Sequence, residues 1–163
     1  MAGLIRIIIH WTAGGADVSA VDREHYHWIV PQEGSAEPGR WPVEANISLK
    51  PGAYAAHTLN CNTGAIGVAL CGMRDAVERP FSPGPSPITT PQVIRAMKFV
   101  AGLCRRYKIP VTRRTVLTHA EVQPTLGVAQ KGKWDIRWLP GMTIAGDALR
   151  VGDHLRAMVD AAR

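Results

Sequence analysis

The sequence has no long apolar run. No stretch approaches the roughly 20 consecutive apolar residues that a membrane-spanning helix needs, so we expect no membrane span. The apolar run near the start, residues 4–9, is too short for the core of a signal peptide and contains Arg6. We therefore expect cytoplasmic synthesis without a signal peptide.

Cysteine is scarce. The chain has three cysteines, Cys61, Cys71 and Cys104, and none of them forms a CxxC pair. An odd number leaves one thiol over from any bridge, which indicates reduced thiols. We expect Cys71 and Cys104 to be small core residues rather than nucleophiles.

Dense runs of basic charge are also lacking, although the chain is basic overall. Its formal net charge is +6 and its pI is about 9.7, which favours polyanionic partners such as nucleic acid, anionic lipid or an acidic wall polymer. The basic residues gather only briefly, at residues 105–108 and 113–114. This pattern is weaker than a nucleic-acid-binding arm, so no nucleic acid partner is expected.

What is present is the composition of a folded domain. The chain has 163 residues, of which 46% are hydrophobic and 20% charged, and it has no internal repeat or low-complexity segment. A chain of this length can bury one ordinary core without disulfide bonds. We expect a single domain spanning residues 1–163, and a monomer.

Apolar periodicity predicts strands mixed with helices. The expected strands lie at residues 4–9, 26–30, 65–70 and 115–117, and the expected helices at residues 18–24, 90–109 and 145–162. Thr90 is the expected cap of the second helix, with Pro91 at its first position. The pattern predicts an α/β (mixed) fold with a central mixed β-sheet flanked by helices. Residues 31–51 and 79–87 are expected to be loops, and residues 121–138 a long loop of functional type.

Two histidines follow apolar strands, His10 after residues 7–9 and His119 after residues 115–118. Strand ends are rigid platforms, and imidazole is a common zinc ligand. Asp135, in the long loop, would supply a third ligand and leave one position open for water, as in catalytic zinc sites. From the residues alone, the alternative remains that these histidines satisfy only their own hydrogen bonds.

Several stretches resemble, in order, the type 2 N-acetylmuramoyl-L-alanine amidases, the superfamily of phage lysozyme-like amidases and peptidoglycan recognition proteins. They are IIIHWTA at 7–13, YHWIV at 26–30, AHT at 56–58, NTGAIGV at 62–68, THAEV at 118–122, KWD at 133–135 and LPG at 139–141. The resemblance covers about residues 4–141. It implies a zinc-dependent (Zn²⁺) amidase that hydrolyses the bond between the muramoyl lactyl group and the L-alanine of the peptidoglycan stem peptide.

The resemblance also assigns roles to particular residues. It implies that His10, His119 and Asp135 bind zinc. Lys133 would stabilise the oxyanion, and Tyr26 would orient the attacking water or relay a proton. His57 and Asn62 would line the substrate cleft.

Other residues near the site have more than one interpretation. Trp134 could stack on substrate, although large aromatic residues fill cores as often. His25 and His27, on either side of Tyr26, are alternative ligands. If residues 26–30 form a strand, alternation points both of them away from the face that Tyr26 uses.

The chain departs from the family at one catalytic position, because Ala69 stands where some members carry a glutamate. The general base would then be Tyr26, His57 or the zinc-activated water. A phage-type endolysin, released to the bacterial cell wall, fits the compact basic chain. The alternatives are a cytosolic muropeptide-recycling amidase and a non-catalytic peptidoglycan-binding module.

Overall fold

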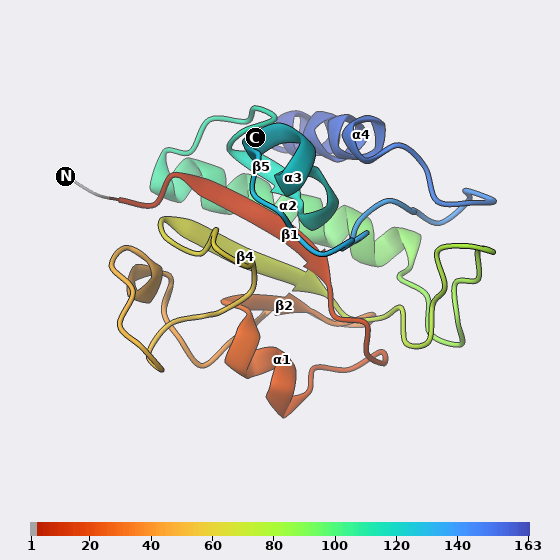
Figure 1. The fold of residues 1–163 in the computed structure, drawn as a ribbon, viewed down its shortest axis with the longest axis horizontal. Coiled ribbons are helices and arrows are strands. Elements are labelled where there is room, and N and C mark those ends of the chain that lie inside the picture. Colours follow the sequence, from red (N-terminus) through yellow and green to blue (C-terminus); the bar gives the residue numbers. More distant parts are fainter. Residues whose placement is uncertain (1–2) are drawn as a thin grey trace.

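The computed structural model describes residues 3–163, which form a five-stranded mixed sheet with helices around it (Figure 1). The strands are β1 (Arg6–Trp11), β2 (Trp28–Val30), β3 (Glu37–Pro38), β4 (Ala65–Leu70) and β5 (Val116–Thr118). Their order in the sheet is β3-β2-β4-β1-β5, and all neighbours are parallel except the antiparallel pair β2 and β3. The predicted mixed α/β sheet is confirmed.

The helices begin at residues that can cap them. They are α1 (Ala20–His25), the 3₁₀ turn η1 (Val43–Asn46), α2 (Thr90–Tyr107), α3 (His119–Leu126) and α4 (Ala148–Ala161). Thr89 caps α2 with a capping box to Gln92, so the predicted cap at Thr90 was wrong by one residue. The predicted C-terminal helix starts at Ala148 rather than at residue 145, because Asp147 accepts the hydrogen bond of the cap.

Residue size differs between the two faces of the sheet. On β4, Ile66 and Leu70 belong to the main core cluster, which also contains apolar residues of α2 and α4. In Figure 1, α2 passes behind the strands. Gly67 and Ala69 point to the opposite face, since side chains alternate along a strand. The small residues leave room on that face for polar side chains above the sheet.

Three sequence predictions of local structure need correction. β1 runs to Trp11, so His10 lies within the strand rather than after it. β2 starts only at Trp28, because Tyr26 is the C-cap residue of α1. The predicted loop at residues 121–138 is wrong in its first part, which belongs to α3 despite Pro124 inside the helix. The Glu121 carboxylate accepts the backbone N–H of Thr118 at 2.8 Å, and this start signal outweighs the proline.

Other predictions for buried and apolar residues hold. The cysteines Cys61, Cys71 and Cys104 are free and buried. Within residues 3–163, none of the helices is long and apolar enough to cross a membrane.

Candidate metal centre and cleft

Three buried side chains, from His10, His119 and Asp135, converge at the carboxyl end of the central strands. Nδ1 of His10 lies 3.1 Å from Nδ1 of His119 and 3.2 Å from Oδ2 of Asp135. Nδ1 of His119 lies 3.3 Å from the same Oδ2. One possible ligand atom from each residue lies within 4.8 Å of the others. The sequence predicted this set, and the structure brings its members together.

Parallel pairing of β1 with β5 explains how two distant histidines meet. Ile9 is in register with Thr118. The next residues, His10 and His119, therefore lie side by side at the carboxyl ends of β1 and β5. His119 is also the first residue of α3. Asp135 joins them because the backbone N–H of Ala120 donates to the carbonyl oxygen of Asp135, at 2.6 Å. Asp135 is therefore fixed to the first turn of α3.

The donor set fits a divalent metal ion such as zinc. Two imidazoles and one carboxylate are typical zinc ligands, and catalytic sites use three protein ligands. Burial lowers the pKa of His10 to about 4, which keeps its ring neutral near neutral pH. Burial opposes ionisation of Asp135, but hydrogen bonds with His10 and His119 outweigh it and lower its pKa. Burial likewise disfavours protonated His119, whereas its bond to Asp135 raises its pKa.

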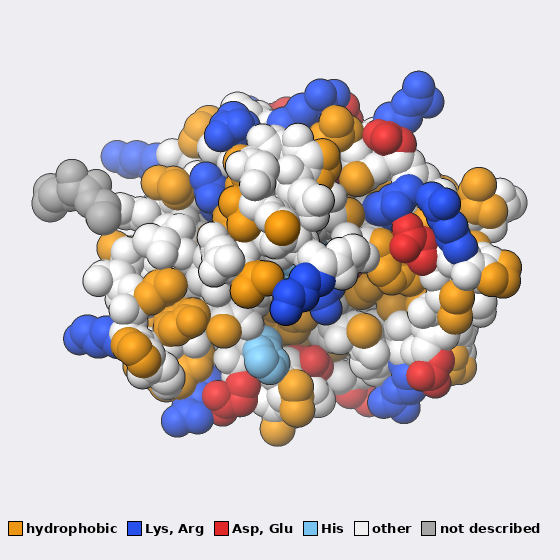
Figure 2. Space-filling view, viewed as in Figure 1, with side chains coloured by type: hydrophobic (Ala, Val, Ile, Leu, Met, Phe, Trp, Pro, Cys, Tyr) orange, Lys and Arg blue, Asp and Glu red, His pale blue; other side chains and the backbone are white. Residues whose placement is uncertain are grey.

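A cleft of about 510 Å³ opens beside His119 and Asp135, and its lining also includes Tyr26, His57, Lys133 and Trp134. A second hollow of about 510 Å³ adjoins it and shares His57 and Lys133. Figure 2 shows Lys or Arg side chains next to a histidine near the centre of this face. Larger cavities of about 730 and 740 Å³ lie elsewhere, without the metal-binding residues, so size alone does not identify the site.

Tyr26 and Lys133 both border the cleft. The Tyr26 ring centroid lies 5.2 Å from that of His10, and burial raises the pKa of the Tyr26 hydroxyl, so it keeps its proton. Lys133 is exposed, and its backbone N–H donates to Gln130 in a turn. Lys133 and Asp135 face the same cleft.

His57 and Asn62 belong to one loop beside the metal-binding residues. Nδ1 of His57 lies 3.1 Å from Nε2 of His10, and burial lowers the pKa of His57 well below its usual value. Oδ1 of Asn62 accepts hydrogen bonds from the backbone N–H groups of His57 and Thr58. Asn62 thus holds the loop and also borders the adjoining hollow.

The tryptophans divide between the cleft and the core. Trp134 is half-buried, lines the cleft and packs edge-on against Trp11 at 4.7 Å between centroids. Trp11 and Trp138 are core residues. Trp28 packs on Phe99 of α2, on the other side of the sheet.

The alternative ligands His25 and His27 do not join the metal-binding set. His25 is the last residue of α1 and is exposed, so strand alternation does not apply to it. His27 is buried and bonds to Asn46 and to the backbone N–H of Gly67.

Sequence reasoning missed Gln130 entirely. Its Oε1 lies 2.8 Å from Nε2 of His119, and the residue is buried. It also missed the pair formed by Glu121 and Arg156. A threonine followed three residues later by a glutamate, as at Thr118 and Glu121, is typical of a helix start and could have singled out Glu121. No neighbouring residue in the sequence singles out Gln130.

Comparison with known families agrees with this geometry. A family model described as N-acetylmuramoyl-L-alanine amidase matches residues 5–141. No curated protein sequence matches the chain.

Solved structures with similar folds are also peptidoglycan-related. N-acetylmuramoyl-L-alanine amidase LysC from Clostridium intestinale URNW has a TM-score of 0.54 at 14% identity, over 98% of this chain and 87% of LysC. The endolysin from Thermus scotoductus MAT2119 bacteriophage Ph2119 has a TM-score of 0.51 at 19% identity, over 77% of each chain. The complex of peptidoglycan recognition proteins LCa and LCx with tracheal cytotoxin has a TM-score of 0.53 at 16% identity, over 89% and 80%. These similarities establish the same fold.

Proposed function

This chain belongs to the N-acetylmuramoyl-L-alanine amidase family, and on that premise we propose that it is a zinc-dependent enzyme hydrolysing the muramoyl–L-alanine amide of peptidoglycan. The observation that carries the proposal is the convergence of His10, His119 and Asp135 beneath a cleft. We propose that these residues hold the zinc ion. Zinc in such a site acts as a Lewis acid and makes a water nucleophile available near neutral pH.

Lys133 and Tyr26 serve the chemical step in this proposal. The Lys133 ammonium stabilises the negative charge that develops on the amide oxygen as water attacks the carbonyl carbon. The Tyr26 hydroxyl orients the water. Because burial raises the pKa of Tyr26, the phenol acts as a hydrogen-bond donor rather than as a base.

Substrate binding is proposed for the residues that line the cleft further from the metal-binding atoms. Trp134 offers a half-buried aromatic surface that can stack on a sugar ring or cover a peptide. Asn62 and His57 border the adjoining hollow, where the stem peptide would extend. Ala69 is fully buried beside His10 in the sheet, so no carboxylate from that position serves as a base.

We propose an endolysin-type role for a monomeric enzyme acting on the bacterial cell wall. The similarity in fold to LysC and to the phage endolysin supports this role, and the net charge of +6 favours an anionic wall. The alternative within the same chemistry is an enzyme that acts on soluble muropeptide fragments.

Metal analysis paired with mass spectrometry of digested peptidoglycan tests the proposal. We expect about one zinc per chain, release of intact stem peptides from purified peptidoglycan, loss of turnover on chelation and recovery on adding zinc. Metal-independent lysis would reject the zinc enzyme, and binding without cleavage by zinc-loaded protein would favour a recognition module. Cleavage of soluble fragments but not of polymeric peptidoglycan would favour the recycling role.

A further inference from the structure

The three converging atoms restrict where the histidine protons can be. A neutral imidazole carries its proton on one nitrogen and a lone pair on the other, and only the lone pair can bind a metal. In His10 and His119 the nitrogen facing Asp135 is Nδ1. Both rings can therefore serve as ligands only when their protons lie on Nε2.

Gln130 determines the proton position of His119. The amide nitrogen of Gln130 donates to the carbonyl oxygen of Leu59 at 2.9 Å and approaches that of Val128 at 3.4 Å. Carbonyl oxygens only accept, so the amide cannot be flipped and its Oε1 must face His119. That Oε1, 2.8 Å from Nε2 of His119, can only accept as well, so it draws the His119 proton to Nε2, in competition with Oδ2 of Asp135, 3.3 Å from Nδ1.

His57 determines the proton position of His10 by the same logic. Nε2 of His57 faces the carbonyl oxygen of Ala65 at 3.3 Å, so it carries the proton of the neutral ring. Nδ1 of His57 is then an acceptor, 3.1 Å from Nε2 of His10. The hydroxyl of Thr58 bonds to Nδ1 of His57 at 2.8 Å and lies 3.4 Å from Nε2 of His10. Its oxygen can also accept a proton from Nε2 of His10. His57 and Thr58 can therefore both accept a proton from Nε2 of His10, in competition with Oδ2 of Asp135, 3.2 Å from Nδ1.

One loop, residues 57–62, holds the hydrogen-bond partners of both His10 and His119. The His57 ring lies directly against β4, where a Cβ on Gly67 would come within 2.6 Å of it. Asn62 holds the backbone N–H groups of His57 and Thr58, and Leu59 supplies the carbonyl that orients Gln130. Residues 57–62 thus connect to the outer nitrogen of both histidines.

We propose that His57 and Gln130 are positioning residues that hold the protons of His10 and His119 on Nε2 and so direct both Nδ1 lone pairs at the metal. The inference rests on the proposed function, because it assumes that His10 and His119 are the zinc ligands. Outer partners of metal-binding histidines fix ring orientation and tautomer, and their loss typically weakens metal binding about 10- to 100-fold. Gln130 thereby acts through a ligand and not on the substrate, and His57 acts through a ligand in addition to bordering the hollow proposed for the stem peptide.

The unaltered protein provides the first test. Ring-nitrogen NMR of the ¹⁵N-labelled, metal-free chain at about pH 9, well above the ordinary imidazole pKa, reports the tautomer of each neutral histidine. The His10→Gln and His119→Gln variants assign the two signals. We expect the Nε2–H form for both rings. A predominant Nδ1–H form in either ring would overturn the proposal for that ring.

Substitutions at Gln130 separate the acceptor from the packing. Gln130→Met keeps the side-chain length and removes the acceptor, so zinc affinity measured by chelator competition should fall about 10- to 100-fold. Gln130→Glu keeps an oxygen acceptor for His119 and should retain the Nε2–H tautomer, although its second oxygen then faces the carbonyl of Leu59 and should lower stability. Gln123→Ala is the matched control, because Gln123 bonds only to the backbone N–H of Gln130 and should leave both readouts unchanged.

His57 has a corresponding pair of variants. His57→Leu removes the acceptor, whereas His57→Asn places an amide oxygen at the same number of bonds from Cβ as Nδ1. The Nε2–H signal of His10 and the zinc affinity should be lost together in His57→Leu and recovered in part in His57→Asn. Equal losses in the two variants would contradict a role for the acceptor.

The readouts distinguish this inference from the proposed function. If wild-type protein binds no zinc but both rings show the Nε2–H tautomer, the zinc enzyme is rejected while the proton assignment stands. If wild-type protein binds zinc tightly and Gln130→Met changes neither tautomer nor affinity, the zinc site stands and the role of Gln130 is rejected.

Discussion

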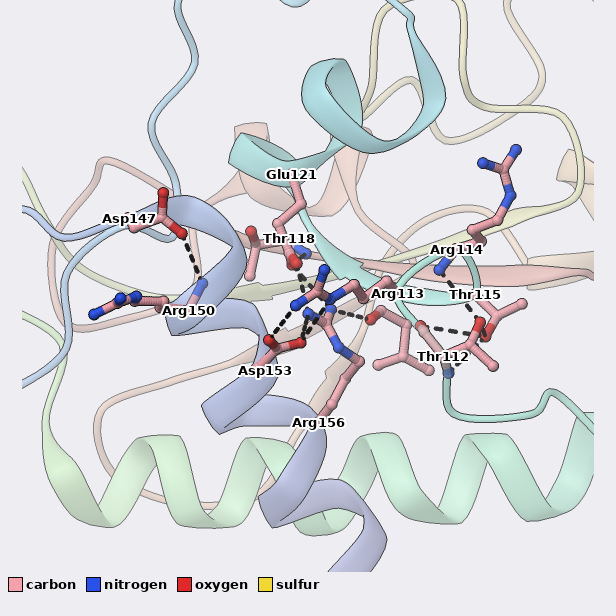
Figure 3. Close-up of polar contacts among 11 residues, drawn as sticks. Thr112, Arg113, Arg114, Thr115, Thr118, Glu121, Asp147, Arg150, Asp153 and Arg156 are labelled. Carbon is pink, nitrogen blue, oxygen red and sulfur yellow. Dashed lines mark hydrogen bonds and ion pairs between the residues drawn. The ribbon is translucent and has the colours of Figure 1, made fainter.

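Arg156 and Glu121 form a buried ion pair beneath the first turn of α3 (Figure 3). Nη2 of Arg156 lies 2.7 Å from Oε1 of Glu121, and Nη1 lies 3.1 Å from Oε2. The same Oε2 accepts the backbone N–H of Thr118 at 2.8 Å. The carboxylate therefore links β5, α3 and α4 at the residue pair Thr118–His119, where the proposed metal-binding segment begins.

Removing the arginine should destabilise the fold strongly. Arg156→Met leaves the Glu121 carboxylate buried without its counter-charge, and breaking such a pair typically costs about 3–5 kcal/mol of unfolding free energy. Denaturant unfolding followed by circular dichroism measures this loss. Arg113→Ala breaks only the exposed pair with Asp153 and should change stability little. Similar losses of unfolding free energy in the two variants would show that the buried pair stabilises the fold no more than the exposed pair does.

Gly152 in α4 is required by the same carboxylate. A Cβ at this position would overlap the Glu121 carboxylate, so Gly152→Ala should lower the unfolding free energy although alanine favours helix by about 1 kcal/mol. Gly102→Ala in α2 is the matched control, since the nearest atom to its Cβ would be Nη2 of Arg105 at 3.7 Å. Thermal unfolding should rank Gly102→Ala above wild type and Gly152→Ala below it. The opposite order would contradict the steric explanation.

The parts of this fold that are encoded locally could be predicted from the sequence. The apolar run before His10 and the continuous apolar segment of β4 indicate buried parallel strands, and the predicted limits of β4 match the structure. Parallel neighbours then bring His10 and His119 to one edge. The resemblance to a family added Asp135, which spacing alone left uncertain.

Contacts between distant segments could not be predicted in this way. Gln130 is meaningful only because Leu59, far away in the sequence, orients its amide. From the sequence alone, Gly152 is only a weak point in a helix, because nothing local shows that the Glu121 carboxylate lies against it. The predicted loop after His119 failed because Pro124 is a strong local signal against a helix, while the buried Glu121, which accepts the backbone N–H of Thr118, stabilises α3.

His27 should make the fold sensitive to mild acid. Burial lowers its pKa to about 4, whereas in the unfolded chain it titrates near its ordinary value of about 6.5. Below about pH 6.5 the unfolded state binds the proton and the folded state does not, so the His27 contribution to stability falls by about 3 kcal/mol as pH drops to about 4. Above about pH 6.5 it is constant.

A variant isolates this contribution. His27→Gln removes the titrating group, and urea unfolding at a series of pH values should show a shallower loss of stability between about pH 6.5 and 4 than in wild type. His10 and His57 remain in both proteins, so only the difference between the two curves belongs to His27. Parallel curves would contradict the assignment.

Tyr26→Phe tests whether the phenol acts through its hydroxyl. The variant should keep the fold and the zinc content, because the Tyr26 side chain is absent from the metal-binding set. Turnover of peptidoglycan should fall about 100-fold or more if the hydroxyl orients the attacking water. Tyr107→Phe, at the end of α2 and outside both the cleft and the adjoining hollow, is the control and should retain activity. An unchanged rate in Tyr26→Phe would remove Tyr26 from the mechanism.

Metal binding and transition-state stabilisation should separate between His119 and Lys133. His119→Ala removes a proposed ligand and should lose both zinc and activity. Lys133→Ala leaves the metal-binding atoms in place, so it should keep zinc while its rate constant falls about 100- to 1,000-fold, as for loss of an oxyanion donor. Lys131→Ala is the control, because Lys131 borders the same cleft and the same adjoining hollow but has no assigned catalytic role. Zinc content by atomic emission and single-turnover rates measure the two effects independently. Equal rate losses in the two lysine variants would mean that the positive charge of the cleft attracts substrate, and that Lys133 has no particular position at the reacting amide.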